Sequence, residues 1–480
     1  MDRKTTEKKK LSMIFPDFEG TPLAYRAFVP PLGLLTLAAL TPPEFEIGFV
    51  DERSDTINFD EEADVVAISA MTPQAARAYE IADRFRARGV RVVMGGPHPS
   101  LLPEEALLHA DAVVVGEAEN IWCGVLSDVL AGRSAGIYVC RRKPDLSGLP
   151  FPRHDLLNEA NYLPIRSIQV TRGCPLNCEF CTVPKNFGRE YRIRPTDDVL
   201  SEIERLPSHL YFVDDNLMIK RRSFTGLFDR MGDMDKRWTG MAPLAIASDA
   251  KYVDLLARSG CWSMYVDVGP WLSVGLRGDV SSLKEQVSRS VGYIKKLQDA
   301  GIKVMGSFVF GFDYDEEPIF EATLKFLLMS GIVEAEFLIL TPYPNTPLAE
   351  KLEAQDRIVS RDWSRYNTTH AVFRPARMTP EILEEGVGYL WREFYRQTDL
   401  PEGFVLPNVT AEARRAHERI LSAVPILFRD MAHEGVLTGL SGVSGKIGVE
   451  QLVRIWKSSN PPIFTRIVGS VYEELGYKQS

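Results

Sequence analysis

The chain has 480 residues, of which 45% are apolar and 25% charged, as is ordinary for a globular protein, and its length predicts about three domains rather than one core. Its net charge of −9 argues against a general nucleic-acid surface, and the lack of any run of about 18 apolar residues argues against a membrane span. Residues 1–10 are polar and basic with no apolar leader behind them, so we expect a cytoplasmic protein, in which clustered thiols bind metal more often than they form disulfides.

The first region of the chain alternates short apolar strands with helices. Continuous apolar strands joined by helices are typical of a doubly wound parallel sheet, a Rossmann-like fold. Ligands of such sheets bind at the carboxyl ends of the strands. We expect strands at Leu11–Phe15, Glu46–Asp51, Asp64–Ser69, Val90–Met94 and Ala112–Val115, and helices at Pro31–Leu40, Pro73–Arg88 and Pro103–His109.

Glycines stand at two of these strand ends. Gly95 and Gly96 open a GGPHP loop that also holds His98, and Gly116-Glu117 ends the strand VVVGEAE. Because glycine has no Cβ, these positions would let the backbone approach a flat, bulky ligand. The alternative is that they are ordinary turn glycines of a Rossmann-like sheet.

The order of these segments, with the GGPHP loop and the VVVGEAE strand end, resembles the cobalamin-binding domain that precedes many radical S-adenosylmethionine (SAM) domains. The resemblance covers roughly residues 11–135 and implies that the glycines, His98 and Glu117 contact cobalamin. The Asp-x-His-x-x-Gly motif, whose histidine ligates cobalt in other cobalamin proteins, is absent, and His109 lies in a helix without that context. The resemblance therefore implies cobalamin without the usual histidine ligand. A domain that has kept the fold but lost cobalamin is the alternative.

A second motif places three cysteines within eight residues. Cys174, Cys178 and Cys181 are spaced C-x3-C-x2-C, just after an apolar strand. A cubane iron–sulfur cluster normally takes four thiolates, so three close ligands imply one open iron. The alternative is a zinc knuckle or a set of structural cysteines, but zinc needs a fourth Cys or His, and the nearest histidines, His154 and His209, are distant in sequence.

The cysteine spacing resembles that of the radical SAM enzymes. The resemblance implies a 4Fe-4S cluster whose open iron is chelated by the amino and carboxylate groups of SAM. It also implies that Phe180, the aromatic residue before the last cysteine, shields the cluster from water. The reduced cluster would cleave SAM to methionine and a 5′-deoxyadenosyl radical, which requires an electron donor such as flavodoxin or ferredoxin.

After the cysteine loop, about six βα units follow one another, as in the partial (β/α)6 barrel of radical SAM enzymes. Domains are accordingly expected at 1–140 (Rossmann-like, cobalamin-binding), 141–165 (a Pro-rich linker), 166–376 (barrel) and 377–480 (helical). The expected barrel strands are Arg166–Thr171, Leu210–Val213, Thr239–Ala247, Ser263–Val268, Lys303–Phe310 and Glu334–Leu340, and the helices are Thr196–Leu206, Arg222–Arg230, Lys251–Arg258, Leu283–Ala300 and Pro318–Ser330.

Two barrel strands end in carboxylates. Catalytic groups of barrels lie on the loops after the strands, so Asp214 and Asp215 are candidates for binding SAM or substrate, with a solvated Asx turn as the alternative. Asp267 stands near the position where many relatives carry a ribose-binding glutamate, and this departure leaves the ribose contact unassigned.

Two further segments resemble family motifs. Gly306, Ser307 and Gly311 belong to GSFVFGF, which resembles the strand that stacks on the SAM adenine; a buried strand with a bulge is the alternative. Tyr343 lies in TPYPNTPL, which resembles the last-strand signature of cobalamin-domain radical SAM proteins, and is a candidate catalytic residue at the barrel mouth. Its prolines equally suit a rigid structural turn.

The last region is helical in pattern. The segment Ile382–Gln397 is amphipathic and aromatic, which suits a core helix or a wall of the substrate site, and Leu437–Gly448 reads as a loop. Taken together, the resemblances imply a cobalamin-dependent radical SAM methyltransferase that acts on an unactivated carbon of a bulky small molecule, such as a tetrapyrrole, a lipid or a natural-product intermediate. The alternatives are a radical SAM enzyme that forms a ring, rearranges or oxidises its substrate, and a non-enzymatic iron–sulfur or zinc module.

Overall fold

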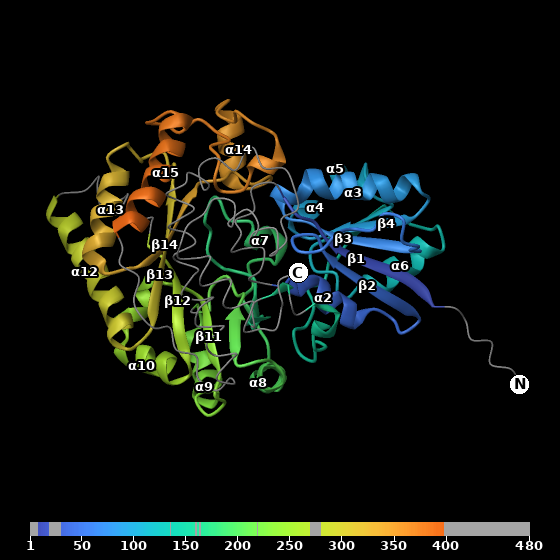
Figure 1. Cartoon of the computed structure of the whole chain (residues 1–480), viewed down its shortest axis with the longest axis horizontal. Helices are drawn as coiled ribbons and strands as arrows, with labels where there is room; N and C mark the ends of the chain where they lie inside the picture. The colour runs from blue at the N-terminus through green and yellow to red at the C-terminus, as the bar shows by residue number, and fades with distance from the viewer. Residues whose placement is uncertain are drawn as a thin grey trace, which may run out of the picture. The chain divides into compact units, whose positions relative to one another are not determined.

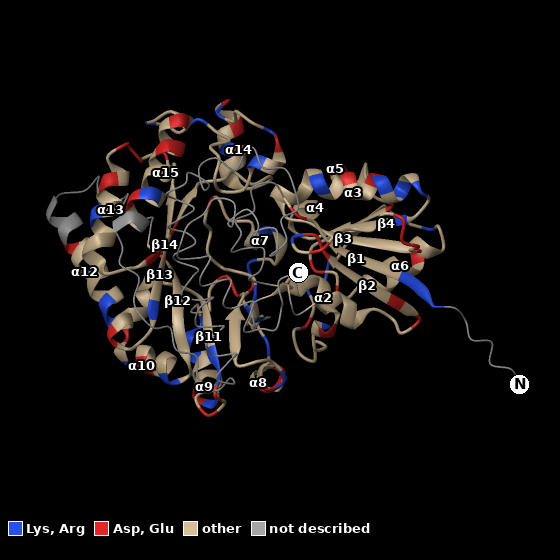
Figure 2. Cartoon of the chain, in the orientation of Figure 1, with Lys and Arg blue, Asp and Glu red and all other residues tan. Residues whose placement is uncertain are grey.

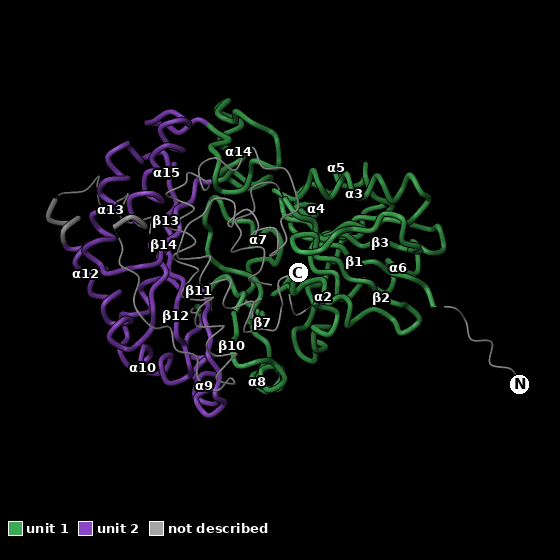
Figure 3. The backbone as a smooth tube through the Cα atoms, viewed as in Figure 1, with its two compact units in different colours: residues 1–219, 341–373 green, residues 220–340, 374–480 purple. Residues whose placement is uncertain are grey.

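The computed structural model describes residues 8–18, 30–134, 136–158, 161–162, 165–217, 219–268 and 280–397 (Figure 1). The chain divides into two compact units, each made of separate stretches of sequence (Figure 3). Unit 1 holds residues 1–219 and 341–373, and unit 2 holds residues 220–340 and 374–480.

Unit 1 begins with a six-stranded parallel sheet in the order β2-β1-β3-β4-β5-β6. Its strands are β1 (Lys9–Phe15), β2 (Phe45–Asp51), β3 (Val65–Ser69), β4 (Arg91–Gly95), β5 (Ala112–Val115) and β6 (Gly136–Val139). Its helices are α2 (Leu32–Leu40), α3 (Ala75–Ala87), α4 (Pro97–Leu101), α5 (Pro103–Leu107) and α6 (Trp122–Leu130), with a short 3₁₀ turn, η1 (Thr72–Gln74).

Alternation along the strands buries both faces of this sheet. In β3, Val66 and Ile68 join a core cluster with the inner face of α3, whereas Val65 and Ala67 join a second cluster with α2 and α6. Successive side chains of a strand point to opposite faces, so a continuous apolar strand has to be covered twice. The helices lie accordingly on both faces of the sheet (Figure 1). The predicted doubly wound sheet is confirmed.

The remainder of unit 1 carries the cysteine motif. A parallel pair joins β7 (Ile165–Ile168) to β10 (His209–Phe212), and an antiparallel pair joins β8 (Thr171–Arg172) to β9 (Arg192–Ile193). The helices and 3₁₀ turns here are η2 (His154–Leu156), α7 (Val183–Asn186), α8 (Thr196–Arg205), α14 (Pro347–Ala354) and η5 (Trp363–Arg365).

Unit 2 is a parallel run of strands in the order β14-β13-β12-β11, with helices between consecutive strands. In β13, Phe308 and Phe310 point toward α13 and pack on the rings of Phe326 and Phe320. The strands are β11 (Arg237–Pro243), β12 (Cys261–Asp267), β13 (Lys303–Phe310) and β14 (Glu334–Ile339); the helices are α9 (Arg221–Met231), α10 (Ala250–Arg258), α12 (Val280–Asp299), α13 (Ile319–Ser330) and α15 (Pro380–Gln397), with the 3₁₀ turn η4 (Leu244–Ser248).

The six strands expected of the barrel are all present, two in unit 1 and four in unit 2. Helix α15 corresponds to the predicted amphipathic helix, while the rest of the predicted helical tail, including the loop at Leu437–Gly448, lies outside the described residues. The predicted domain boundaries remain predictions.

Acidic and basic side chains are interspersed along α3 (Figure 2), where Arg77 and Glu80 pair. None of the described helices is long and apolar enough to cross a membrane.

Candidate active site

The cysteine loop is closed at its base by a short antiparallel pair of strands. Arg172 of β8 lies opposite Arg192 of β9, and the loop between them carries all three cysteines. The loop begins at Gly173, whose φ is +86° and where a Cβ would lie 2.1 Å from the carbonyl oxygen of Glu190. The Cys174 N–H then donates to the carbonyl of Gly188 at 3.2 Å. The two ends of the loop are therefore in backbone contact, which only glycine permits at this position.

The three thiols lie within electrostatic range of one another. Cys174 is buried, Cys178 is exposed and Cys181 is intermediate. Burial raises the pKa of the Cys181 thiol to about 11, and the charges of Asp215, Cys178 and Cys174 raise it further. In the described part of the chain, no three Cys, His, Asp or Glu side chains lie close enough together to hold a metal ion as they stand. Three soft thiolates on one closed loop fit an iron–sulfur cluster with an open iron.

Asp214 holds the strand that leads into this loop. The carboxylate follows β10, is fully buried, and accepts hydrogen bonds from the Val170 N–H at 3.0 Å, the Thr171 N–H, and the Thr171 hydroxyl at 2.6 Å. Burial raises the pKa of Asp214 to about 7, against the opposing effect of these hydrogen bonds. A carboxylate occupied in this way fixes the backbone, and a catalytic role for Asp214 stays a prediction that the geometry does not favour. Asp215, next along the chain, is exposed.

Glu117 also reaches the base of the loop. Its carboxylate accepts from Arg172 at 2.8 Å and from both terminal nitrogens of Arg192, at 2.6 and 3.1 Å. Lys143 lies 3.5 Å away, and Glu119 forms a further ion pair with Arg172. Glu117 is therefore engaged by protein cations, and its predicted contact with a cofactor stays a prediction.

The TPYPNTPL segment forms the turn into α14 and contacts the cysteine loop. The Thr346 side chain caps α14 by accepting from the Ala349 N–H at 3.3 Å, and its hydroxyl donates to the carbonyl of Tyr343 at 2.6 Å. In the first turn of the helix, the Leu348 N–H donates to the carbonyl of Glu179, between Cys178 and Cys181, at 3.0 Å. The motif thus supports the loop structurally, and the catalytic role of Tyr343 stays a prediction.

The predicted cobalamin residues follow the carboxyl ends of β4 and β5. Gly96 has a φ of +93°, and a Cβ there would lie 2.7 Å from Ser69 Oγ, so this glycine allows two strand ends to approach closely. Gly95 ends β4, and Gly116, with a φ of +81°, follows β5. His98 is fully buried, with ring nitrogens 3.3 Å from Thr72 Oγ1 and 3.0 Å from the Tyr79 hydroxyl. The geometry favours a packing role for His98, consistent with a domain that lacks a histidine ligand to cobalt.

Unit 2 places a polar group on one face of its sheet. The Tyr265 hydroxyl of β12 lies 2.8 Å from Ser307 Oγ of β13 and 2.6 Å from Glu336 Oε2 of β14. Burial raises the pKa of Glu336, opposed by the hydrogen bond from Tyr265. Ser307 was predicted as a site residue, whereas Tyr265 and Glu336 were missed. The sequence feature that could have revealed them is the recurrence of polar residues at alternate positions of apolar strands. Such alternation marks the face of a sheet that is turned away from its covering helices.

The other predicted residues of unit 2 separate from this group. Gly306 points to the opposite face of β13, where a Cβ would lie 2.8 Å from the ring of Phe308. Gly311 has a φ of +107°, and its N–H donates to the carboxylate of Asp315 at 2.9 Å, which forms the turn after β13. Both glycines thus have structural reasons to be glycine. Asp267 is exposed at the end of β12.

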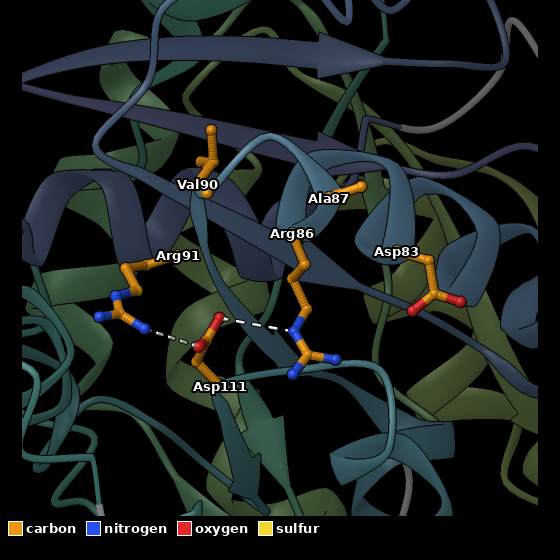
Figure 4. A pocket seen from close by; sticks show the side chains of 7 residues that line it. Asp83, Arg86, Ala87, Val90, Arg91 and Asp111 are labelled. Carbon is orange, nitrogen blue, oxygen red and sulfur yellow. Dashed lines mark hydrogen bonds and ion pairs between the residues drawn. The ribbon is translucent and has the colours of Figure 1, made fainter.

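A hollow of about 430 Å³ lies at the amino ends of β4 and β5, away from the predicted cofactor edge (Figure 4). It is lined in part by Arg86 and Arg91, each of which forms an ion pair with Asp111. Ligands of doubly wound sheets bind at the carboxyl ends of the strands, so this hollow is not the active site.

Comparison with known proteins identifies the family of the chain. The B12 binding domain family model matches residues 24–126. The chain is 34% identical to bacteriochlorophyllide d C-12(1)-methyltransferase of Chlorobaculum tepidum over 76% of this chain and 82% of that protein. It is 30% identical to bacteriochlorophyllide d C-8(2)-methyltransferase of the same organism over 80% of this chain and 91% of that protein. Its fold matches the radical SAM methyltransferase TsrM of Kitasatospora setae, with a TM-score of 0.62 over 94% of this chain and 100% of that chain, at 16% identity.

These findings confirm the family inferred from the cysteine spacing and the strand-end glycines. The B12 match covers most of the doubly wound sheet, and both methyltransferases align with this chain over more than four fifths of their own length. The cofactors of the family are cobalamin, a 4Fe-4S cluster and SAM. The chain therefore belongs to the cobalamin-dependent radical SAM methyltransferases.

Proposed function

We propose that this enzyme methylates an unactivated carbon of a bulky, largely apolar ring compound of the tetrapyrrole class. Two relatives at 34% and 30% identity are named as methyltransferases of bacteriochlorophyllide d, which supports this substrate class. Lipids and natural-product intermediates of similar size are the nearest alternatives within the same reaction.

The cysteine loop is the observation that carries the proposal. Its base is closed by β8 and β9, and its chain is supported by Asp214, Glu117 and the first turn of α14. Cys174, Cys178 and Cys181 would hold the cluster, and Phe180 would limit water at its edge. When bound, the cluster and SAM supply a carbon radical and cobalamin carries the methyl group. The protein then has to bind, orient and protect.

The polar group of unit 2 is the best candidate for binding a polar part of SAM or substrate. Tyr265 is held between Ser307 and Glu336, so its hydroxyl is oriented before any ligand arrives. Asp215 and Asp267 are exposed at strand ends, where a ligand amino or hydroxyl group would reach them. Gly95, Gly96 and Gly116 would line the cobalamin edge.

A reduced cluster needs an electron source and a reducing surrounding. We infer a small one-electron donor of the flavodoxin or ferredoxin type, because the cluster must be reduced before it can cleave SAM. We also infer a cytoplasmic location, because all six cysteines are free thiols in the structure.

An anaerobic assay with SAM labelled as CD₃ tests the reaction. Protein reconstituted with iron, sulfide and hydroxocobalamin is incubated with a reductant and bacteriochlorophyllide d, and the products are analysed by mass spectrometry. We expect a CD₃ group in place of one hydrogen of the pigment. A product with a new ring or a lost hydrogen pair but no label would favour a non-methylating radical SAM reaction instead.

Cysteine variants distinguish the loss of the cluster from a general effect of removing a cysteine. Cys178→Ala should abolish both 5′-deoxyadenosine formation and methyl transfer, because the cluster loses a ligand. Cys123→Ala is the matched control, since this cysteine is exposed on α6, remote in sequence from the loop, and its loss should leave both products unchanged. Equal activity of the two variants would exclude the proposed cluster site.

A further inference from the structure

Glu117 lies between two arginines that face each other across a strand pair. Arg172 and Arg192 are direct partners in the β8–β9 register, and both donate to the Glu117 carboxylate. The Glu117 side chain is only 2% exposed, and those of Arg172 and Arg192 are 9% and 11% exposed. This group of three side chains, here called the loop-base clasp, is therefore almost entirely removed from water.

Charge explains why the clasp needs its carboxylate. Like charges placed directly opposite each other destabilise an antiparallel pair, and burial makes the repulsion stronger. The Glu117 carboxylate accepts a hydrogen bond from Arg172 and two from Arg192, so it contacts both charges at once, while Glu119 forms a further ion pair with Arg172 alone. The bidentate contact with Arg192 also fixes the orientation of the two side chains.

The clasp joins two parts of unit 1 that are far apart in sequence. Glu117 follows β5 of the doubly wound sheet, after a turn at Gly116. The arginines immediately flank the cysteine loop, because Arg172 precedes Gly173 and Arg192 follows Tyr191. Two neighbouring contacts reinforce the junction: Lys143 binds the carbonyl of Asn186 at 2.9 Å, and Arg192 binds the carbonyl of Phe187 at 3.2 Å.

We propose that Glu117 is a positioning residue that fixes the base of the cysteine loop to the end of β5, rather than a ligand of a cofactor. The inference rests on the proposed cluster site at Cys174, Cys178 and Cys181. It predicts that the charge of Glu117 governs how firmly the loop holds its cluster, while cobalamin binding is left largely intact.

The test compares two glutamates of like burial in the full-length protein. Glu117→Gln removes the negative charge of the clasp, and Glu52→Gln removes that of a carboxylate that is 1% exposed, follows β2 and is bound to Arg77 of α3. Iron release to a chelator, the electron paramagnetic resonance spectrum of the reduced cluster with and without SAM, and hydroxocobalamin binding are measured for each. For Glu117→Gln we expect about tenfold faster iron release and an altered SAM-dependent spectrum, the lower range for residues that support metal ligands. Glu52→Gln should match the wild type in iron release and in the SAM-dependent spectrum.

A second substitution separates charge from folding. In Glu117→Gln/Arg192→Gln one arginine charge is also removed, so the two strands no longer repel, and we expect iron release to return most of the way to the wild-type rate. If Glu117→Gln fails to fold, recovery of folding in the double variant supports the charge argument, and failure of both variants to fold overturns it.

Each possible result has a distinct meaning. Wild-type iron release and spectra in Glu117→Gln would overturn the inference, as would loss of hydroxocobalamin binding with an intact cluster, which would make Glu117 a cofactor contact. Failure of the second substitution to slow iron release would also overturn the charge argument. If the wild-type protein takes up no cluster at all, the proposed function fails and not the clasp alone.

Discussion

Gly173 shows at the scale of one residue how the cysteine loop is closed. Its φ of +86° is unfavourable for other residues, and a Cβ would lie 2.1 Å from the backbone oxygen of Glu190. A left-handed conformation alone costs an alanine roughly 1–2 kcal/mol, and here a backbone clash adds to it. We expect Gly173→Ala to lower the free energy of unfolding by more than about 2 kcal/mol and to reduce the iron bound after reconstitution.

Gly89→Ala is the matched control for this substitution. Gly89 has a φ of +79°, but nothing lies within 4 Å of the position a Cβ would take. Its replacement should therefore cost only about 1 kcal/mol and leave iron binding unchanged. Equal iron content in the two variants would show that close approach of the loop ends is not needed for the cluster.

His154 makes the stability of unit 1 depend on pH. Burial, together with the charge of Arg166, lowers the pKa of His154 to about 4, and neither ring nitrogen has a hydrogen-bond partner. In the unfolded chain the pKa of a histidine is about 6.5, so between this pH and pH 4 the unfolded chain binds a proton that the folded chain does not bind. Stability from this group is thus complete above pH 6.5 and is lost as the pH falls toward 4, by up to about 3 kcal/mol.

Urea unfolding at pH 7 and pH 4.5 measures this effect. The stability lost between the two pH values should be smaller in His154→Gln than in the wild type, because glutamine does not titrate. Carboxylates titrate in both proteins and cancel in the comparison. An identical loss in both proteins would mean that His154 takes up its proton without unfolding.

Individual residues were predictable where chemistry fixes their spacing. The three cysteines were predicted as cluster ligands because one cluster needs thiolates within reach of each other, and the structure places them on one closed loop. Glu117 and Asp214 were predicted to contact ligands, and in the structure they are bonded to Arg172 and Thr171, which lie 55 and 43 residues away in sequence. No local pattern encodes such distant hydrogen bonds, so these partners could not be predicted, and the ligand contacts of both carboxylates stay predictions.

At the scale of elements, α15 packs on α13 through a glycine. A Cβ on Gly386 would lie 2.1 Å from the ring of Phe320, which is itself buried. Alanine normally stabilises a helix relative to glycine by roughly 0.5–1 kcal/mol, but overpacking a core costs about 1–3 kcal/mol. The clash is the larger effect, so we expect Gly386→Ala to lower the thermal midpoint.

Gly292→Ala, in the same unit, should change the stability in the opposite direction. Gly292 lies inside α12, and nothing is within 4 Å of its potential Cβ. Helix propensity then acts alone, and the substitution should stabilise by roughly 0.5–1 kcal/mol. Thermal unfolding of both variants checks the pair; a stabilised Gly386→Ala would mean that α15 does not approach Phe320 so closely.

Elements with a strong period were predicted within a few residues. β13 matches its predicted bounds because its apolar run is bracketed by Gly301 and Gly311. The two-residue strands β8 and β9 and helix α14 were not foreseen, since so short a pair has no period to detect and TPYPNTPL reads as a turn. These are the elements that hold the cysteine loop, so the sequence indicated the loop but not its supports.

At the scale of the whole molecule, the B12 match and the cysteine loop fall in unit 1, whereas Tyr265, Ser307 and Glu336 fall in unit 2. A ligand stabilises only the state that binds it, by about 2.7 kcal/mol at a hundred times its Kd. We expect hydroxocobalamin at that concentration to slow amide exchange of β4 and β5 by up to about a hundredfold, where exchange occurs through unfolding of unit 1.

The strands of unit 2 serve as the internal control in the same hydrogen-exchange experiment. Cobalamin should bind at the strand ends of the doubly wound sheet, so β12 and β13 should gain much less protection than β4 and β5. The two units share three chain crossings, at residues 219–220, 340–341 and 373–374, which would transmit stability only if the units unfold together. Equal protection throughout would therefore show a single cooperative molecule, and no protection of β4 would contradict cobalamin binding at this edge.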